Sequence, residues 1–277
     1  MYYFLYNPLS SNKDTSQKVE ALCKKMSKEN ETHLVNIMEI SGKENEFLQQ
    51  RQPEEIVVLC GGDGTVNTFI NRIDTDLIKC KLYLYTCGTG NDFAREYKKH
   101  FFEITEQVKT SPRLRINGET NYRFVNGAGI GVDAVVCRNK TQYKMSRIKK
   151  SYLSISISAL KTFRTYSADI ELDDNKYHYD NVWFIISNHG KYFGGGMKVT
   201  PKAVRDDEYL DVCIVHKASF ATLLFLFPFI YIGLHTLFKK YVTIVRAKKV
   251  KIVPNGCYTL QHDGEVLENV KLVEVER

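Results

Sequence analysis

The stretch 57-VVLCGGDGTVNTFINRI-73 carries the strongest fold signal in the chain. Its apolar run stops at Gly61 and is typical of a parallel strand that is covered on both faces of a sheet. Helical spacing of apolar residues begins at Val66. Strand, glycines and helix in this order build open parallel sheets, which bind ligands beyond the carboxyl ends of their strands. The stretch also raises a question, because Asp63 stands among three glycines at that position.

Glycine lets backbone N–H groups approach a phosphate closely, and the positive end of the following helix points to the same place. Thr65 adds a hydroxyl donor. A carboxylate repels phosphate, so Asp63 needs another role: it holds Mg²⁺, contacts a ribose or a phosphate-bound cation, or accepts a proton. The alternative is structural, a tight turn in which Asp63 caps a helix. A lone G-G-x-G does not separate these roles.

A second stretch, 88-GTGNDFAR-95, has the same build of strand, glycines, polar pair and helix. Two glycine turns at neighbouring strand ends, each with an acid, predict a nucleotide site. The P-loop pattern G-x-x-x-x-G-K-[ST] and the Rossmann pattern G-x-G-x-x-G are both absent, so the site belongs to neither class.

Strand and helix patterns alternate through residues 1–112, which predicts a Rossmann-like parallel α/β domain. From Ser111-Pro112 onward the pattern changes to strands joined by polar turns, with helical exceptions at 151–163 and 218–238. We therefore expect an antiparallel β-sandwich domain over residues 113–277, with a nucleotide cleft between the two domains and the last residues packed back on the first.

Composition is that of an ordinary globular protein, with 43% apolar and 26% charged residues. The net charge of +7 favours anionic partners such as nucleotides or acidic membrane surfaces. The seven cysteines form no C-x-x-C pair, which favours a reduced intracellular protein without a zinc site. No secretory signal is visible, and no motif that reads RNA or DNA is present, so we expect no nucleic acid partner.

The segment 218-ASFATLLFLFPFIYIGLHTLF-238 is as long as a membrane span. Pro228, Gly233 and His235 interrupt it, so we expect a buried helix or a helix that lies on a membrane surface. The basic residues that flank it suit an anionic bilayer. Leu226 is the position at which we expect a glutamate to weaken vesicle binding.

GGDGT followed by GTGNDFAR resembles the diacylglycerol kinase catalytic domain family, which includes bacterial lipid kinases and sphingosine kinases and is related to NAD kinases. Three further stretches extend the resemblance along nearly the whole chain: 125-VNGAGIGVDA-134, 193-FGGGMKVTPKA-203 and 262-HDGE-265. Five ordered motifs are far more specific than any one of them.

The resemblance implies ATP and Mg²⁺ as cofactors and roles for named residues. The general base would come from Asp263, Glu265 or Asp63. A structural Mg²⁺ would bind Asp207 and the main-chain carbonyls of Val204 and Tyr209. The nucleotide would contact Asn7, Pro8, Ser41, Gly61, Gly62, Asp63, Gly64, Thr65, Asn67, Thr68, Gly88, Thr89, Asn91 and Asp92.

Two turns depart from the family pattern. The first, 7-NPLSS-11, lacks the final glycine of a phosphate-contacting turn. The second, 206-DDEYLD-211, has Glu208 where the family has glycine, which strains a left-handed position if the turn keeps its shape.

We therefore predict a kinase that transfers the γ-phosphate of ATP to the hydroxyl of a membrane lipid, with diacylglycerol as first-choice acceptor. The alternatives are another acceptor (a sphingoid base, a polyprenol or NAD) and a catalytically weak nucleotide or lipid sensor. The expected location is cytoplasmic, peripherally associated with the inner face of the membrane. Exposed strands of the second domain would allow a homodimer.

Overall fold

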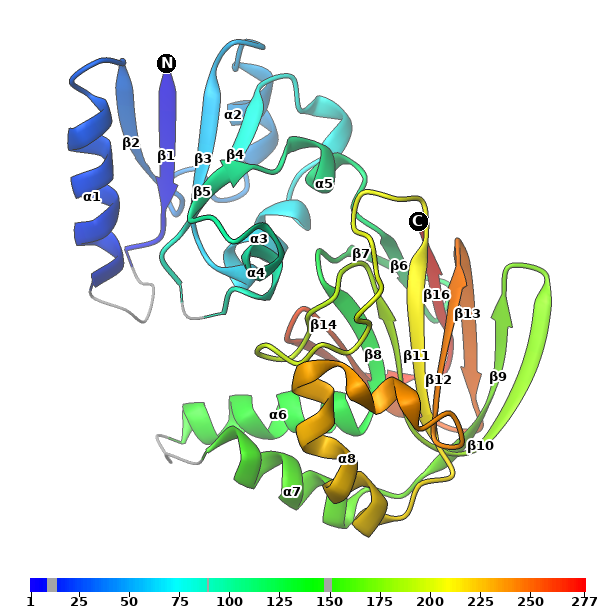
Figure 1. Cartoon of the computed structure of the whole chain (residues 1–277). Helices are drawn as coiled ribbons and strands as arrows, with labels where there is room; N and C mark the ends of the chain where they lie inside the picture. Colours follow the sequence, from blue (N-terminus) through cyan, green and yellow to red (C-terminus); the bar gives the residue numbers. More distant parts are fainter. Residues whose placement is uncertain (9–13, 89, 147–150) are drawn as a thin grey trace. The chain divides into compact units, whose positions relative to one another are not determined.

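The computed structural model describes residues 1–8, 14–88, 90–146 and 151–277. Within these ranges the chain forms two compact units, Met1–Ser111 and Pro112–Arg277 (Figure 1). Each unit contains one sheet.

The first unit alternates strands with helices, as its sequence predicts. Its elements are β1 (Tyr2–Tyr6), α1 (Asp14–Met26), β2 (Thr32–Asn36), α2 (Glu44–Gln49), β3 (Ile56–Gly61), α3 (Asp63–Ile70), η1 (Thr75–Leu77), β4 (Lys81–Thr86), α4 (Asp92–Tyr97), β5 (Phe101–Glu103) and α5 (Thr105–Lys109).

The five strands of this unit follow the order β2-β1-β3-β4-β5. The first four are parallel, and β5 is added antiparallel to β4. Phe4 in β1 and Val58 in β3 are fully buried and pack with Val19 of α1 in one apolar cluster. Burial of this kind explains why β3 is apolar throughout.

The second unit is built mainly from antiparallel strands. Its elements are β6 (Arg113–Ile116), β7 (Thr120–Arg123), β8 (Gly127–Gly131), α6 (Val132–Met145), α7 (Tyr152–Thr162), β9 (Tyr166–Leu172), β10 (Asn175–Asn188), β11 (Leu210–His216), α8 (Phe220–Ile232), η2 (Leu234–Leu237), β12 (Val242–Ala247), β13 (Lys249–Pro254), β14 (Tyr258–His262), β15 (Glu265–Val270) and β16 (Val273–Glu276).

The long strand β10 organises this sheet. Its first half pairs with β9, and its second half pairs with β8 and β11. The register shifts on both sides of Val182, and irregularities of this kind bend a strand so that it can join two layers. The result is a curled antiparallel sheet. With the mostly parallel sheet of the first unit, it confirms the predicted fold class.

One element of the second unit was predicted wrongly. The residues after Gly131 look like a continuing strand in the sequence, but they form helix α6. Gly131 has a φ of 128°, a conformation that side chains rarely adopt, and it turns the chain from β8 into the helix.

Helices α6, α7 and α8 pack together beside the sheet (Figure 1). They share with it an apolar cluster that includes Val132, Leu160, Trp183 and Leu223. Among the described residues, no helix combines the length and apolar content needed to cross a bilayer.

We expect Gly131→Ala to destabilise the second unit. An added Cβ would lie 2.4 Å from the Trp183 carbonyl oxygen in β10, where β8 and β10 pair. Backbone strain and this contact together should lower the free energy of unfolding by about 3 kcal/mol. Urea titration followed by the fluorescence of Trp183 measures the loss.

Gly256→Ala is the matched control, because a Cβ there meets only ordinary contacts with the Tyr258 ring. Its free energy of unfolding should stay within about 0.5 kcal/mol of the wild type. Equal stability of the Gly131 and Gly256 variants would contradict this account of the β8–α6 junction.

Candidate active site

The two glycine turns lie at adjacent strand ends. Gly61, the last residue of β3, pairs with Thr86, the last residue of β4. The turns are also hydrogen-bonded to each other through the backbone. The N–H groups of Cys87 and Gly88 donate to the Gly61 carbonyl at 3.1 and 3.3 Å, and the Asp63 N–H donates to the Gly90 carbonyl at 2.9 Å.

This close approach explains two of the glycines. A Cβ on Gly62 would lie 2.3 Å from the Gly90 carbonyl oxygen, and one on Gly88 would lie 2.7 Å from the Gly62 nitrogen. Both distances are too short for a side chain. The glycines therefore let two backbone turns pack directly on each other, which places the start of α3 next to the start of α4.

Asp63 answers the question that the sequence raises. Its Oδ2 accepts the Asp92 N–H at 2.8 Å, and its Oδ1 accepts the Phe93 N–H at 3.1 Å. Both groups belong to the first turn of α4, so Asp63 caps that helix from the other glycine turn and stabilises its positive end. Asp63 is thus engaged in holding the two turns together. The sequence indicated a capping role as an alternative, but not for this helix.

The start of α3 remains the place for an anion. Gly62 is its N-cap residue, Gly64 is exposed, and Thr65 is half-buried. The Thr65 side chain packs over Gly61, since a Cβ on that glycine would lie 2.0 Å from the Thr65 hydroxyl. A helix N-terminus with glycines and a hydroxyl is suited to phosphate.

Several other predicted nucleotide residues lie at the same edge of the sheet. Asn91 donates to the Gly88 carbonyl at 3.0 Å and stabilises the second turn. Asp92 is buried at the start of α4, with Arg95 3.7 Å from its carboxylate. Asn7 and Pro8 follow β1, which is the neighbour of β3.

The remaining predicted nucleotide residues differ in position. Thr68 is exposed one turn into α3, whereas Asn67 is buried and accepts a hydrogen bond from Asn71 at 3.3 Å. Thr89 lies outside the described residues. Ser41 accepts a hydrogen bond from Arg72, which lies beyond the C-terminal end of α3, so the structure does not bring Ser41 to the glycine turns.

In the second unit, Asp263 binds a backbone segment. Its carboxylate accepts the N–H groups of Val125, Asn126 and Gly127 at 2.6, 2.9 and 3.2 Å. Asp263 itself has a φ of 48°, in the left-handed region. These contacts tie the loop before β8 to the turn between β14 and β15.

Arg205 binds a backbone carbonyl of the same loop. The sequence did not identify it as a residue of the site. It is buried, donates to the Val125 carbonyl and contacts the Asn126 side chain at 3.1 Å. Burial, with the nearby charge of Arg205, lowers the pKa of His189 well below its usual value, so His189 is neutral. No local motif distinguishes Arg205, because its partners are distant in sequence.

Glu265 differs from Asp263. It is exposed at the start of β15, opposite His262 in the register of the hairpin. Burial lowers the pKa of His262, which packs on the Tyr122 ring, while the charges of Asp263 and Glu265 act in the opposite direction. Glu265 is therefore the acid of this turn that solvent or a ligand can reach.

In the turn that we predicted to bind a metal, protein groups already form hydrogen bonds and an ion pair with the expected ligand residues. Arg246 forms an ion pair with Oδ2 of Asp207, and Oδ1 accepts the Tyr209 N–H at 2.8 Å. The Val204 carbonyl accepts the Asp207 N–H at 3.2 Å, and Arg277 donates to the Asp207 carbonyl at 2.9 Å. This donor set does not fit a bound cation, because a guanidinium already neutralises the carboxylate.

Within the described ranges, no three His, Cys, Asp or Glu side chains group in a way that could hold a metal ion. We therefore assign no step to a metal at the Asp207 turn.

Comparisons with known proteins agree with this architecture. The family model for the "Diacylglycerol kinase catalytic domain" matches residues 1–118, and the "YegS C-terminal NAD kinase beta sandwich-like domain" matches residues 127–275. The chain is 24% identical to "Putative lipid kinase YtlR" of Bacillus subtilis over 96% of this chain and 93% of the relative. It is 27% identical to "Diacylglycerol kinase" of Staphylococcus epidermidis over 94% of this chain and 84% of the relative.

A solved structure shares the fold over the whole length. "Crystal structure of a putative diacylglycerol kinase from Bacillus anthracis str. Sterne" superposes with a TM-score of 0.71 at 21% identity, covering 100% of this chain and 92% of that one. The order of the two matched domains, the locked glycine turns and the curled sheet lead to one conclusion. The chain belongs to the bacterial diacylglycerol/lipid kinase family, with a diacylglycerol kinase catalytic domain followed by a YegS C-terminal domain.

Proposed function

We propose that this family member transfers the γ-phosphate of ATP to the hydroxyl of diacylglycerol and so forms phosphatidic acid. The observation that carries the proposal is the pair of glycine turns locked together by Asp63 at the start of α3. Membership of a lipid kinase family supports a lipid acceptor and ATP as donor.

In this proposal the phosphates of ATP bind the start of α3, where Gly64 is exposed and Thr65 offers a hydroxyl. Mg²⁺ bound together with ATP would supply charge compensation for the phosphate oxygens. Asp63 is committed to capping α4, and Arg95 lies 3.7 Å from the buried carboxylate of Asp92, so we assign neither acid of the glycine turns to this ion.

Glu265 is the residue that we assign as proton acceptor from the lipid hydroxyl. A general base has to reach the proton that it removes, and Glu265 is exposed. Asp263 is the positioning residue, because its carboxylate accepts three backbone N–H groups.

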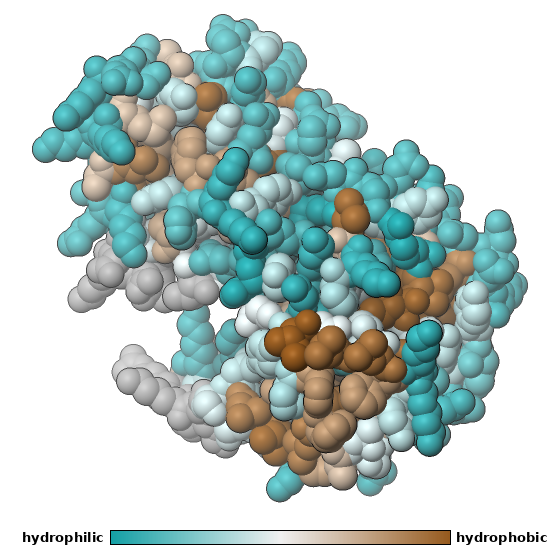
Figure 2. All heavy atoms as spheres, in the orientation of Figure 1, coloured by the Kyte–Doolittle hydropathy of each residue, from teal (hydrophilic) through white to brown (hydrophobic). Residues whose placement is uncertain are grey.

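A membrane surface is the proposed source of the acceptor. Phe225, Ile232 and Leu237 of α8 and η2 are 59%, 62% and 71% exposed. Figure 2 shows apolar side chains gathered over this part of the second unit. Lys239 and Lys240 follow directly and are exposed, which suits an anionic bilayer.

Phosphate transfer from labelled ATP and Mg²⁺ into a panel of lipids in mixed micelles tests the proposal. The panel contains diacylglycerol, a sphingoid base and a polyprenol, with NAD as a soluble acceptor. Labelled phosphatidic acid is the expected product. Transfer to another acceptor would replace the substrate, and ATP binding without any transfer would favour a sensor.

Asp63→Asn separates capping from proton transfer. The amide cannot accept both the Asp92 and Phe93 N–H groups, so the unfolding free energy should fall by about 1–2 kcal/mol. ATP affinity should fall with it, because the two turns lose their link. Thermal melting and calorimetric titration with ATP measure both effects. A variant with unchanged melting and ATP binding but no turnover would instead make Asp63 the base.

Glu265→Gln should lower kcat by about 100-fold or more, because it removes the proton acceptor. Its melting temperature and ATP affinity should equal those of the wild type, since the side chain is exposed. Steady-state kinetics with diacylglycerol measures the loss.

Asp263→Asn is the informative comparison for Glu265→Gln. It should lower the melting temperature, because one oxygen of the N–H cluster becomes a donor. The assignment of Glu265 is overturned if Glu265→Gln keeps wild-type kcat while a stably folded Asp263→Asn loses it.

Phe225→Glu and Ile232→Glu should each reduce binding to vesicles that contain phosphatidylglycerol. Tyr177→Glu, an exposed aromatic on the β9–β10 hairpin, is the matched control. The structure corrects the choice of Leu226 for this test, because Leu226 is only 4% exposed. Vesicle flotation with equal binding of all three variants would rule out this membrane surface.

A further inference from the structure

The turn before β11 is where this chain departs from the metal-binding pattern that its family resemblance implies. That pattern has a cation on the Asp207 carboxylate. Here Arg246 of β12 forms an ion pair with Asp207. Its Nε also lies 3.9 Å from Oδ2 of Asp211, whose side chain is only 4% exposed. One guanidinium therefore contacts two carboxylates, as a divalent cation would.

Strand pairing fixes this guanidinium in place. Arg246 is the register partner of Asp211 in the antiparallel pair of β11 and β12. Opposite charges that face each other across such a pair attract. The Tyr209 ring supports the same group, with the Arg246 Cζ 4.6 Å from the ring centroid. The sheet thus positions Arg246 at the turn without the help of a ligand.

Two further cations hold the turn from other parts of the sheet. Lys248, between β12 and β13, pairs with Glu208 at 2.5 Å. Arg277, which follows β16, donates to the Asp207 carbonyl at 2.9 Å and to the Arg205 carbonyl at 3.1 Å. Glu208 stands where the family pattern has glycine, so the change that disturbs the metal turn also supplies the partner of Lys248. We call Arg246, Lys248 and Arg277 the cationic latch.

The cationic latch is connected to the loop that Asp263 holds. The Arg205 carbonyl accepts from Arg277, and the Arg205 side chain donates to the Val125 carbonyl. The Val125 N–H in turn donates to the Asp263 carboxylate at 2.6 Å. Hydrogen bonds therefore join the turn before β11 to the turn that carries the proposed proton acceptor.

We propose that the cationic latch takes the place of a structural metal ion in this chain. Arg246 compensates the charges of Asp207 and Asp211, so the second unit folds without a divalent cation at this turn. Through Arg205 the latch also orders the loop that Asp263 holds, which makes Arg246 a positioning residue. Its effect on turnover rests on the proposed function, whereas its effect on folding does not.

Electrostatics explains why the latch and a metal ion exclude each other. A Mg²⁺ ion at Asp207 would lie next to the guanidinium of Arg246, and like charges at contact distance repel strongly. A guanidinium is always protonated in proteins. The charge balance of the turn is therefore encoded in the chain and does not depend on the concentration of a metal.

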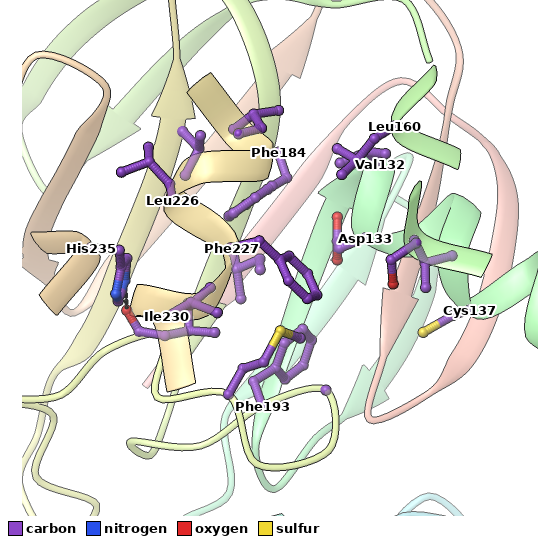
Figure 3. A pocket seen from close by; sticks show the side chains of 18 of the residues that line it. Val132, Asp133, Cys137, Leu160, Phe184, Phe193, Leu226, Phe227, Ile230 and His235 are labelled. Atoms are coloured by element: carbon purple, nitrogen blue, oxygen red, sulfur yellow. Dashed lines mark hydrogen bonds between the residues drawn. The ribbon is translucent and has the colours of Figure 1, made fainter. Parts of the chain in front are cut away.

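The cationic latch lies apart from the apolar cavity of the second unit. Phe193, Phe227 and Ile230 are among the residues that line this cavity (Figure 3). None of the described residues that line it belongs to the turn 204–211 or to the latch. Substitutions in the latch therefore leave the cavity lining unchanged.

Thermal melting of the full chain without nucleotide tests the proposal. Trp183 of β10, the only tryptophan, reports on the second unit, because β10 pairs with β11 directly after the turn. A protein that binds a metal only when folded melts at a higher temperature in its presence. The wild type should melt within about 1 °C of the same temperature in millimolar MgCl₂ and in EDTA. A rise in MgCl₂ that Asp207→Asn abolishes would overturn the proposal.

Arg246→Ser combined with Glu208→Gly should convert the turn into a cation site. In EDTA this double variant should melt about 5 °C or more below the wild type, because the buried Asp211 loses its cation. Millimolar MgCl₂ should recover most of the loss. The proposal fails if the double variant melts like the wild type in EDTA, or if MgCl₂ does not recover the loss.

Electron paramagnetic resonance of added Mn²⁺ gives a second readout that does not depend on melting. The double variant should bind a Mn²⁺ ion that the wild type does not bind. Equal binding of Mn²⁺ by the two proteins would contradict the exchange of a metal for Arg246.

Lys249→Ser is the matched control for the loss of a cross-strand cation. Lys249 is the register partner of Glu276, and the pair is 3.2 Å apart with side chains 72% and 56% exposed. An exposed pair contributes little, so the melting temperature should stay within about 2 °C of the wild type in both solutions. A loss as large as that of the double variant would trace the effect to surface charge in general and refute the role of Arg246.

Turnover tests the positioning role, with kinetics measured well below the melting temperature. Arg246→Ala should lower kcat with diacylglycerol by about tenfold at a constant KM for ATP, because a displaced loop misplaces the proton acceptor. Arg246→Lys keeps the charge and should recover kcat to within about threefold of the wild type. A folded Arg246→Ala variant with wild-type kcat would refute the positioning role. If the wild type phosphorylates no acceptor, the proposed function fails, and melting and Mn²⁺ binding still decide whether the latch replaces a metal.

Discussion

The candidate site depends on one carboxylate that accepts two backbone N–H groups. The Asp63 side chain extends from the first glycine turn and caps α4, the helix that follows the second glycine turn. Without a side chain in that role, two adjacent helix starts would present unpaired donors and two positive ends to each other. Asp63 neutralises one of them and leaves the start of α3 for an anion. The glycines are required because the turns meet backbone to backbone.

The second unit also contains a carboxylate that accepts several backbone N–H groups. Asp263 binds three N–H groups of the loop before β8, and Arg205 binds the carbonyl side of that loop. Asp63 and Asp263, which the sequence offers as candidate proton acceptors, thus hold backbone segments in place. This assignment shifts the proposed proton transfer to Glu265, which is exposed at the same turn.

One departure from the family pattern and the composition of α8 have physical explanations. At the turn with Glu208 in place of glycine, Arg246 pairs with Asp207 and Lys248 with Glu208, so protein cations supply the charge that a metal would bring. Helix α8 is apolar on all sides. Leu226 is buried in the second unit, whereas Phe225 is exposed where we propose a bilayer.

The sequence by itself determined the two kinds of sheet and the adjacent glycine turns, because apolar periodicity and glycine content express local backbone requirements. It indicated the family only through the resemblance of five ordered motifs to known members. It could not determine that Asp63 caps a helix 29 residues away or that Arg205 supports the Asp263 loop. It also missed helix α6, where Gly131, with a φ of 128°, redirects the chain. Only the tertiary structure decided these points, because hydrogen-bond partners that are distant in sequence are chosen by packing.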